Sequence, residues 1–131
     1  MKLYMHPVST AARPVRLLIA ENSIACDEEL VDLTTGAHHQ EPYASLNPSR
    51  LVPMLDDDGF RLTESSAILK YLADKYDLAV YPKDLKKRAR VNEVMGLKLG
   101  FHSDKLKSDD DTADAVAVGK TLLDQLKAGS F

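Results

Sequence analysis

The stretch that decides the fold is LVPMLDDDGFRLTESSAIL, residues 51–69. Two short apolar runs, VPML and FRL, flank the sequence DDG at 57–59, and Asp-Gly between such runs is typical of a tight β-hairpin turn. Apolar residues then recur at helical spacing to about Tyr76, and Thr63 is the expected N-cap. The stretch therefore predicts strand, turn, strand and helix in that order.

The residues before this stretch complete an α/β layer. KLYM at 2–5 predicts a first strand, and helical spacing predicts a helix over about 10–21 with Pro14 in its first turn, where a missing N–H costs little. DEELVDL at 27–33 predicts a second strand, and 34–50 reads as irregular. The order from the residues alone is β-α-β-irregular-β-β-α, an α/β class.

The character of the sequence changes after residue 76. DLAVYPK at 77–83 reads as a linker, and helical patterning follows over about 84–98 and 112–127. We therefore expect a first domain over 1–76, and a shortened helical domain of about two helices over 84–131. Two helices cover only part of each other's apolar faces, so self-association is expected.

Composition excludes several functional classes. The chain has 131 residues, 44% of them apolar, and its 17 basic and 20 acidic residues give a net charge of −3, which argues against a nucleic-acid or membrane surface. The single cysteine, Cys26, has no partner for an internal disulfide, and neither a leader nor a run of about 18 apolar residues is evident. A cytoplasmic protein is expected. The histidines lack metal-ligand spacing, so no metal site is expected.

Two segments of the opening stretch suggest a binding site. An X-Pro bond such as Val52-Pro53 is the place where a cis peptide is cheap, and a cis bond would leave the Val52 backbone free to pair with an extended peptide. Spacing alone favours an ordinary trans proline that begins an edge strand. Glu64 and Ser65 open the following helix, where they either complement the helix dipole or bind the ammonium and carboxylate of an amino-acid head group.

Two further residues are candidates on position alone. Ser9 lies between the first strand and the first helix, so its hydroxyl either caps that helix or donates a hydrogen bond to an anion beside it. No G-x-S-x-G elbow is present, which argues against a serine nucleophile. His38 lies in the irregular segment, where a solvated loop histidine is the usual outcome.

Taken together, four segments resemble one family. These are LYMHPVSTAARPVR at 3–16, NPSRLVPML at 47–55, LTESSAILKYLADKY at 62–76 and VYPKDLKKRARVNEVM at 80–95. The chain resembles the cytosolic glutathione S-transferases of the theta, delta and related bacterial classes over residues 1 to about 95. The resemblance implies a thioredoxin-like domain of order β-α-β-α-β-β-α that binds glutathione, followed by a shortened all-α segment.

The resemblance also implies roles for the candidate residues. Pro53 would be cis, and the Val52 backbone would pair with the cysteinyl part of glutathione. Glu64 and Ser65 would hold the γ-glutamyl end, and His38 would reach the glycyl carboxylate.

The implied reaction is attack of the glutathione thiolate on a small electrophile, with Ser9 donating a hydrogen bond to the sulfur. Glutathione is then a co-substrate, no metal is needed, and a homodimer is expected because the family commonly dimerises. In the family the electrophile pocket is lined by a longer helical domain, so weak activity is expected here. The alternatives are a non-catalytic module that binds glutathione or a protein, and a fragment without an independent role.

Overall fold

The structure is a computed structural model of the chain, and it describes residues 1–99. The chain divides into two compact units, Met1–Tyr81 and Pro82–Phe131. This division lies inside the expected linker, while the exact domain limits stay a prediction.

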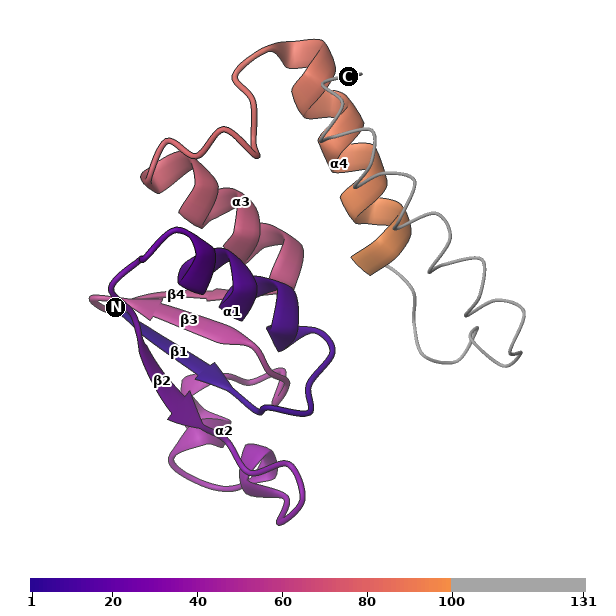
Figure 1. The fold of residues 1–131 in the computed structure, drawn as a ribbon. Helices are drawn as coiled ribbons and strands as arrows, with labels where there is room; N and C mark the ends of the chain where they lie inside the picture. The colour runs from indigo at the N-terminus through magenta and orange to yellow at the C-terminus, as the bar shows by residue number, and fades with distance from the viewer. Residues whose placement is uncertain (100–131) are drawn as a thin grey trace. The chain divides into compact units, whose positions relative to one another are not determined.

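The first unit is built on a four-stranded mixed sheet of order β2-β1-β3-β4 (Figure 1). Strand β1 pairs in parallel with β2 and antiparallel with β3, and β3 pairs antiparallel with β4. The turn between β3 and β4 has positive φ at both Asp58 (53°) and Gly59 (93°), as a tight primed hairpin turn requires. The strands are β1 (Lys2–Met5), β2 (Asp27–Leu30), β3 (Met54–Asp57) and β4 (Phe60–Thr63).

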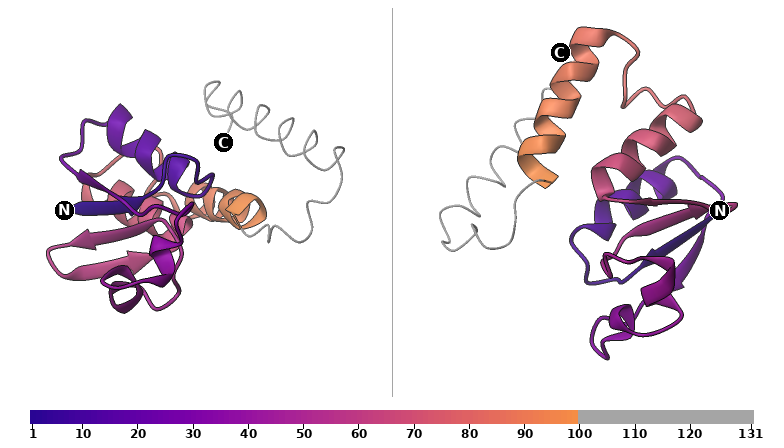
Figure 2. Two further views of the ribbon diagram at one scale, coloured as in Figure 1. Left: turned by 90° about the horizontal axis from the view of Figure 1, so that it is seen from below. Right: turned by 180° about the vertical axis from the view of Figure 1, so that it is seen from behind.

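Helices cover both faces of this sheet (Figures 1 and 2). Helices α1 (Ala12–Glu21) and α3 (Ser65–Lys75) lie side by side on one face. On the other face lie the 3₁₀ turn η1 (Ala37–His39) and the short helix α2 (Tyr43–Leu46). The resulting order, β-α-β-α-β-β-α, confirms the expected thioredoxin-like fold.

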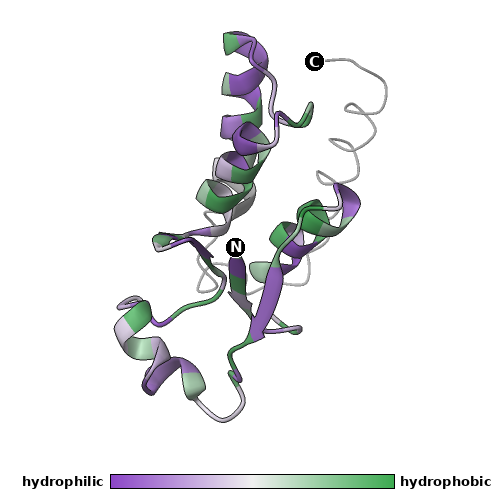
Figure 3. Ribbon diagram, turned by 90° about the vertical axis from the view of Figure 1, so that its left-hand side faces the viewer, coloured by the Kyte–Doolittle hydropathy of each residue, from purple (hydrophilic) through white to green (hydrophobic). Residues whose placement is uncertain are grey.

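Alternation along the strands gives the sheet two cores. Leu3 and Leu55 are fully buried beneath α1 and α3, where Val15, Ile68 and Leu72 reach down to them. Side chains one position along point to the opposite face, because successive strand residues alternate. Met54 packs there against Val31 and Tyr43, with Tyr4 and Val52 at its border. Figure 3 shows both hydrophobic and hydrophilic residues in α1 and α3, as expected of helices that pack one face on a sheet and expose the other.

The hairpin is tied to α3 by one carboxylate. Asp57, at the end of β3, accepts a hydrogen bond from the Tyr71 hydroxyl at 2.5 Å and forms an ion pair with Lys75. The hydrogen bond from Lys75, followed by that from Tyr71, holds the pKa of the Asp57 carboxyl below its usual value. The β3–β4 turn is therefore anchored to the helix that follows it.

Several element limits differ from the expectation. Strand β2 ends at Leu30 instead of Leu33, because Asp32 accepts the Thr34 N–H at 2.9 Å and turns the chain. Strand β3 begins at Met54 instead of Val52, because Pro53 has no N–H for the ladder. The segment expected to be irregular contains η1 and α2.

In the second unit the described residues form helix α4 (Leu85–Leu99), close to the expected range of 84–98. Asp84 begins it, since its Oδ1 accepts the Lys87 N–H at 2.9 Å. The second expected helix, over 112–127, lies outside the described residues. Among residues 1–99, no helix is long and apolar enough to cross a membrane.

A buried asparagine organises the segment that leads into β3. Asn47 is 1% exposed, and its Nδ2 donates to the Leu51 carbonyl at 2.8 Å. Its Oδ1 accepts both the N–H and the hydroxyl of Ser49, at 3.1 and 2.7 Å. The Tyr43 hydroxyl donates to the same Leu51 carbonyl at 2.5 Å. The path of residues 47–51 is thereby fixed by side-chain hydrogen bonds.

We expect Asn47→Ala to lower the free energy of unfolding by about 2–3 kcal/mol, because it leaves Ser49 without its acceptor and removes a donor from Leu51. Urea unfolding followed by circular dichroism measures the change. Asn22→Ala is the matched control: Asn22 is exposed and its side chain makes one hydrogen bond, to the Leu18 carbonyl, so its loss should cost about 0.5 kcal/mol or less. Equal losses for both variants would contradict the organising role of Asn47.

Candidate functional site

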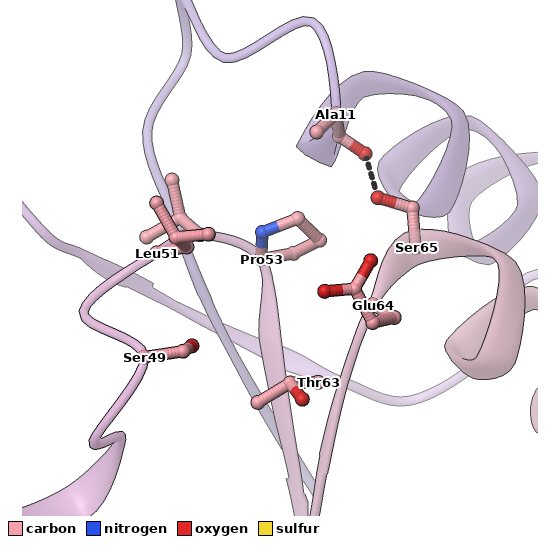
Figure 4. A pocket seen from close by; sticks show the side chains of 8 residues that line it. Ala11, Ser49, Leu51, Pro53, Thr63, Glu64 and Ser65 are labelled. Atoms are coloured by element: carbon pink, nitrogen blue, oxygen red, sulfur yellow. Dashed lines mark hydrogen bonds between the residues drawn. The ribbon is translucent and has the colours of Figure 1, made fainter. Parts of the chain in front are cut away.

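A small pocket of about 90 Å³ opens between the start of β3 and the start of α3 (Figure 4). One side is formed by the chain entering β3 and the other by the β4–α3 junction. The lining residues are Ala11, Ser49, Leu51, Val52, Pro53, Thr63, Glu64 and Ser65. The pocket therefore brings together four of the six predicted site residues, Val52, Pro53, Glu64 and Ser65.

The Val52-Pro53 side of the pocket presents main chain. The peptide bond between the two residues is cis, as the resemblance implies, so the preference for trans from spacing alone is wrong. Pro53 is buried and Val52 is half-buried. Within residues 1–99, neither the N–H nor the C=O of Val52 forms a hydrogen bond. An extended ligand could therefore pair with both groups as an added strand does.

The opposite side is formed by Glu64, whose backbone is unusual. Its φ of 69° and ψ of 116° lie outside the regions that residues with a Cβ prefer. Glu64 is also the N-cap of α3, so the expectation that Thr63 caps the helix and that Glu64 lies in its first turn is wrong. Thr63 instead ends β4. The Glu64 side chain is exposed, makes no capping hydrogen bond, and faces Pro53 across the pocket in Figure 4.

Ser65 joins the two helices at the floor of the pocket. Its hydroxyl donates to the Ala11 carbonyl at 2.7 Å, and the residue is 7% exposed (Figure 4). The first intrahelical bond of α3 runs from the Ile68 N–H to the Glu64 carbonyl. The N–H groups of residues 65–67 therefore lack helical acceptors, and such a helix start favours an anion through its free N–H groups and dipole.

Ser9 lies outside the pocket lining, in the loop between β1 and α1. Its Oγ accepts the Ala12 N–H at 3.1 Å, which is the helix-capping role weighed from the sequence. Because the hydroxyl accepts that bond, its own hydrogen remains available to a further acceptor. The capping role and a donor role are therefore compatible.

His38 is not brought to this pocket. It lies in η1, where its ring contacts that of His39 at 3.9 Å between centroids. Its Nδ1 is buried, and within the described residues it has no hydrogen-bond partner. A buried polar atom without a partner is costly, so this nitrogen is suited to an acceptor that residues 1–99 do not supply.

Cys26 has the surroundings of a structural thiol. It is half-buried, and burial is the main cause that raises the pKa of its thiol, which disfavours the reactive thiolate. No three His, Cys, Asp or Glu side chains within residues 1–99 form a group that could hold a metal ion.

Sequence reasoning missed four pocket residues, namely Ala11, Ser49, Leu51 and Thr63. Three of them are direct neighbours of predicted site residues or of the helix start, and this adjacency is the signal that could have found them. Ser49 is different, because it reaches the pocket only through the turn that Asn47 holds. No local pattern in the sequence shows that a buried asparagine makes this turn.

The fold and site define a class of protein: a thioredoxin-like domain with a ligand pocket between a cis-proline strand start and a helix N-terminus. Comparison with known proteins is consistent with this class. The family described as "Glutathione S-transferase, N-terminal domain" matches residues 1–74. The chain belongs to the glutathione S-transferase family.

Similar curated proteins include theta-class glutathione S-transferases. Glutathione S-transferase theta-2 of Rattus norvegicus is 39% identical over 109 residues, which are 82% of this chain and 43% of the relative. Glutathione S-transferase theta-1 of Homo sapiens is 41% identical over 97 residues, which are 72% of this chain and 40% of the relative. The chain thus spans less than half the length of these relatives.

Solved structures of the same family superimpose on the chain. Human glutathione S-transferase T1-1 in its apo form has a TM-score of 0.70 and 40% identity, and the match covers 74% of this chain and 41% of that one. Human glutathione transferase theta-2, in complex with glutathione and an unknown ligand, has a TM-score of 0.71 and 30% identity. That match covers 95% of this chain and 59% of the other.

We expect Glu64→Gly to raise the free energy of unfolding, by up to about 2.5 kcal/mol. Relief of the unfavourable φ gains about 1–3 kcal/mol, while the added freedom of glycine in the unfolded chain costs about 0.5–1 kcal/mol. Urea unfolding measures the difference. The same replacement at Glu21, which has helical geometry at the end of α1, should lower stability by about 0.5–1 kcal/mol. A loss of stability at both positions would show that Glu64 is not strained.

Proposed function

We propose that the chain binds glutathione at this pocket and promotes attack of its thiolate on an electrophilic substrate. One observation carries the proposal: unpaired main chain at Val52 faces a helix N-terminus and the Glu64 carboxylate across a single pocket. A γ-glutamyl tripeptide has groups that complement both sides. The human theta-2 structure named above contains glutathione, as does a Drosophila mojavensis homologue with a TM-score of 0.77 and 29% identity.

The γ-glutamyl end would occupy the start of α3. Its carboxylate would accept hydrogen bonds from the free N–H groups of residues 65–67, and its ammonium would pair with Glu64. The Ser65 hydroxyl donates to Ala11, so the Ser65 backbone N–H is the group free to donate to the ligand. The cysteinyl residue would pair with the Val52 backbone as an added strand.

The size of the pocket indicates how much of the ligand it holds. A volume of about 90 Å³ is well below the roughly 300 Å³ or more of sites that enclose a drug-sized ligand. The pocket would therefore hold the γ-glutamyl head, and the remainder would extend over the surface of the unit. This placement explains why Ser9 and His38 lie outside the lining although they would contact the sulfur and the glycyl carboxylate.

Ser9 would act on the reactive atom. A hydroxyl that donates to a sulfur stabilises the thiolate relative to the thiol, and the thiolate is the nucleophile. The chemistry needs glutathione as co-substrate and no metal, and the second substrate would be a small electrophile. A cytoplasmic location fits this chemistry, because reduced thiols persist there.

The test is the thiol pKa of bound glutathione, read from thiolate absorbance against pH. We expect Ser9→Ala to raise this pKa by about one unit, since one hydrogen bond to the thiolate is worth about 1–1.5 kcal/mol. The affinity for S-methylglutathione, which has no thiol to ionise, should stay nearly the same in calorimetry. Thr10→Ala, which removes a hydroxyl from the neighbouring residue, is the control. It should change neither the thiol pKa nor the affinity for S-methylglutathione.

Three results would each contradict a part of the proposal. Absence of glutathione binding to the wild-type protein would remove the function altogether. Binding without any lowering of the thiol pKa in the wild type would leave a glutathione-binding module in place of an enzyme. Identical titrations of wild type and Ser9→Ala would remove the role of Ser9.

We also propose that the chain forms a homodimer, in which the edge of β4 takes part. Phe60 on that strand is 52% exposed, and its ring packs against Tyr71 of α3 at 5.4 Å between centroids. An exposed aromatic on an edge strand is a suitable contact for a second copy of the chain.

Sedimentation velocity over a wide concentration range is the test of the dimer. Phe60→Asp should weaken association at least tenfold, because it places a carboxylate in the contact. Leu30→Asp is the control, since Leu30 is 58% exposed on β2, the opposite edge strand, and should leave association unchanged. A monomer at every concentration would contradict the dimer, and equal association of all three proteins would contradict the β4 contact.

A further inference from the structure

We infer that His6 is a positioning residue that holds the Ser9 loop in the geometry needed to donate to the glutathione sulfur. The inference rests on the proposed function, and it adds a residue that neither the sequence patterns nor the pocket identified. His6 follows the last residue of β1 and is 9% exposed. A buried imidazole at the end of a central strand is stabilised by hydrogen bonds to its ring nitrogens.

His6 holds the loop of residues 7–9 through one ring nitrogen and its backbone carbonyl. Its Nδ1 accepts the Val8 N–H at 3.2 Å, and its backbone carbonyl accepts the Ser9 N–H at 3.0 Å. Pro7 has no N–H, so Val8 and Ser9 supply the only backbone donors of residues 7–9. Both donors are therefore bound to the same residue.

Apolar burial does not hold this loop. Val8 is 68% exposed, so its side chain contributes little packing that would keep the loop in place. The start of α1 holds the other end of the loop, because the Ser9 hydroxyl and carbonyl accept hydrogen bonds from the N–H groups of Ala12 and Arg13. His6 is consequently the anchor on the strand side of Ser9, and the start of α1 is the anchor on the other side.

The second nitrogen of the imidazole lies near a carboxylate. Because Nδ1 accepts a hydrogen bond, the ring proton of neutral His6 lies on Nε2. Nε2 lies 3.8 Å from Oδ1 of Asp32, the residue at which the chain turns after β2. Asp32 is held in turn by the N–H and hydroxyl of Thr34, at 2.9 and 2.6 Å, and these hydrogen bonds lower the pKa of its carboxyl.

Contacts therefore run from the turn after β2 to the Ser9 hydroxyl. The Asp32 carboxylate lies near the Nε2 side of the imidazole, the Nδ1 of the imidazole holds the Val8 N–H, and the Ser9 hydroxyl is left with one hydrogen to donate. Loss of the Nδ1 acceptor would release the Val8 N–H, and the Ser9 hydroxyl would then occupy its donating position for less of the time. The effect on glutathione would be on the ionisation of the sulfur, with little effect on the head group bound at α3.

The first experiment needs no ligand. In the full-length protein, the ¹⁵N shifts of the His6 ring should show an unprotonated Nδ1 and a protonated Nε2 near neutral pH. His39, which is exposed in η1, is the internal control and should show the averaged shifts of a solvated histidine. Replacement by His6→Phe should speed exchange of the Val8 amide about fivefold or more, since one hydrogen bond is lost. A protonated Nδ1, or unchanged exchange at Val8, would overturn the inference.

The second experiment measures the sulfur. His6→Phe keeps a flat ring but has no acceptor, and we expect it to raise the thiol pKa of bound glutathione by about half a unit to one unit. His6→Asn places an amide oxygen near the position of Nδ1 and should restore most of the wild-type value. The affinity for S-methylglutathione should be the same for wild type and both variants, which a general loss of structure would not allow.

These readouts separate the two proposals. A wild type that does not lower the thiol pKa of bound glutathione overturns the proposed function, and with it the purpose assigned to His6. If the wild type lowers this pKa and the His6→Phe and His6→Asn proteins lower it equally, the inference about His6 is overturned and the proposed function stands. If His6→Phe does not fold, His6→Gln serves in its place, because its polar atoms reach the Nε2 position and leave the Nδ1 position empty. A wild-type pKa in His6→Gln would then overturn the inference.

Discussion

The carbonyl of Leu51 accepts two side-chain hydrogen bonds, and the geometry of the candidate site depends on them. The Tyr43 hydroxyl and the Asn47 amide reach it from α2 and from the residue that follows α2. Tyr43 is buried against Met54 and Val31, and this burial is the main cause that raises the pKa of its hydroxyl and keeps it a neutral donor. The core on one face of the sheet thereby determines where the main chain enters β3.

The second side of the pocket is held from the other face of the sheet. The Ser65 hydroxyl, at the start of α3, donates to the carbonyl of Ala11, at the start of α1. These two helices share the core formed with Leu3 and Leu55. Each side of the pocket is thus attached to a different core. Strand β3 connects the two cores, because it contributes Leu55 to one and Met54 to the other, and so fixes the two sides of the pocket relative to each other.

Most of the fold could be predicted from the sequence, because its strongest signals are local. The Asp58-Gly59 turn, the helical spacing of α1 and α3, and the missing N–H of Pro53 each act within a few residues. The site was predictable in part, since the resemblance assigned Val52, Pro53, Glu64 and Ser65 and the structure places these four around one pocket. The roles of those residues, and of Ser9 and His38, stay predictions.

The rest depends on contacts between distant segments. The cis bond at Val52-Pro53 opposes the preference drawn from spacing, because the isomer of an X-Pro bond is decided by its surroundings. Spacing likewise gives no sign that Glu64 has a positive φ, since glutamate has no preference for that region. No sequence pattern singles out Asn47 or His6, and their burial and hydrogen bonds show that they hold the loops on either side of the site.

The polar groups of the first unit differ in whether the fold uses them. Asn47, Tyr43 and Asp57 have their hydrogen bonds within the chain, and they hold elements together. The Val52 backbone, the first N–H groups of α3 and Nδ1 of His38 have no partner among the described residues. Groups of the second kind gain more from a ligand, because a ligand satisfies them without breaking an existing hydrogen bond. Because their neighbours in the fold are held by hydrogen bonds, these unpaired groups keep a constant geometry. A site with a constant geometry can bind a flexible peptide without the cost of ordering its own residues.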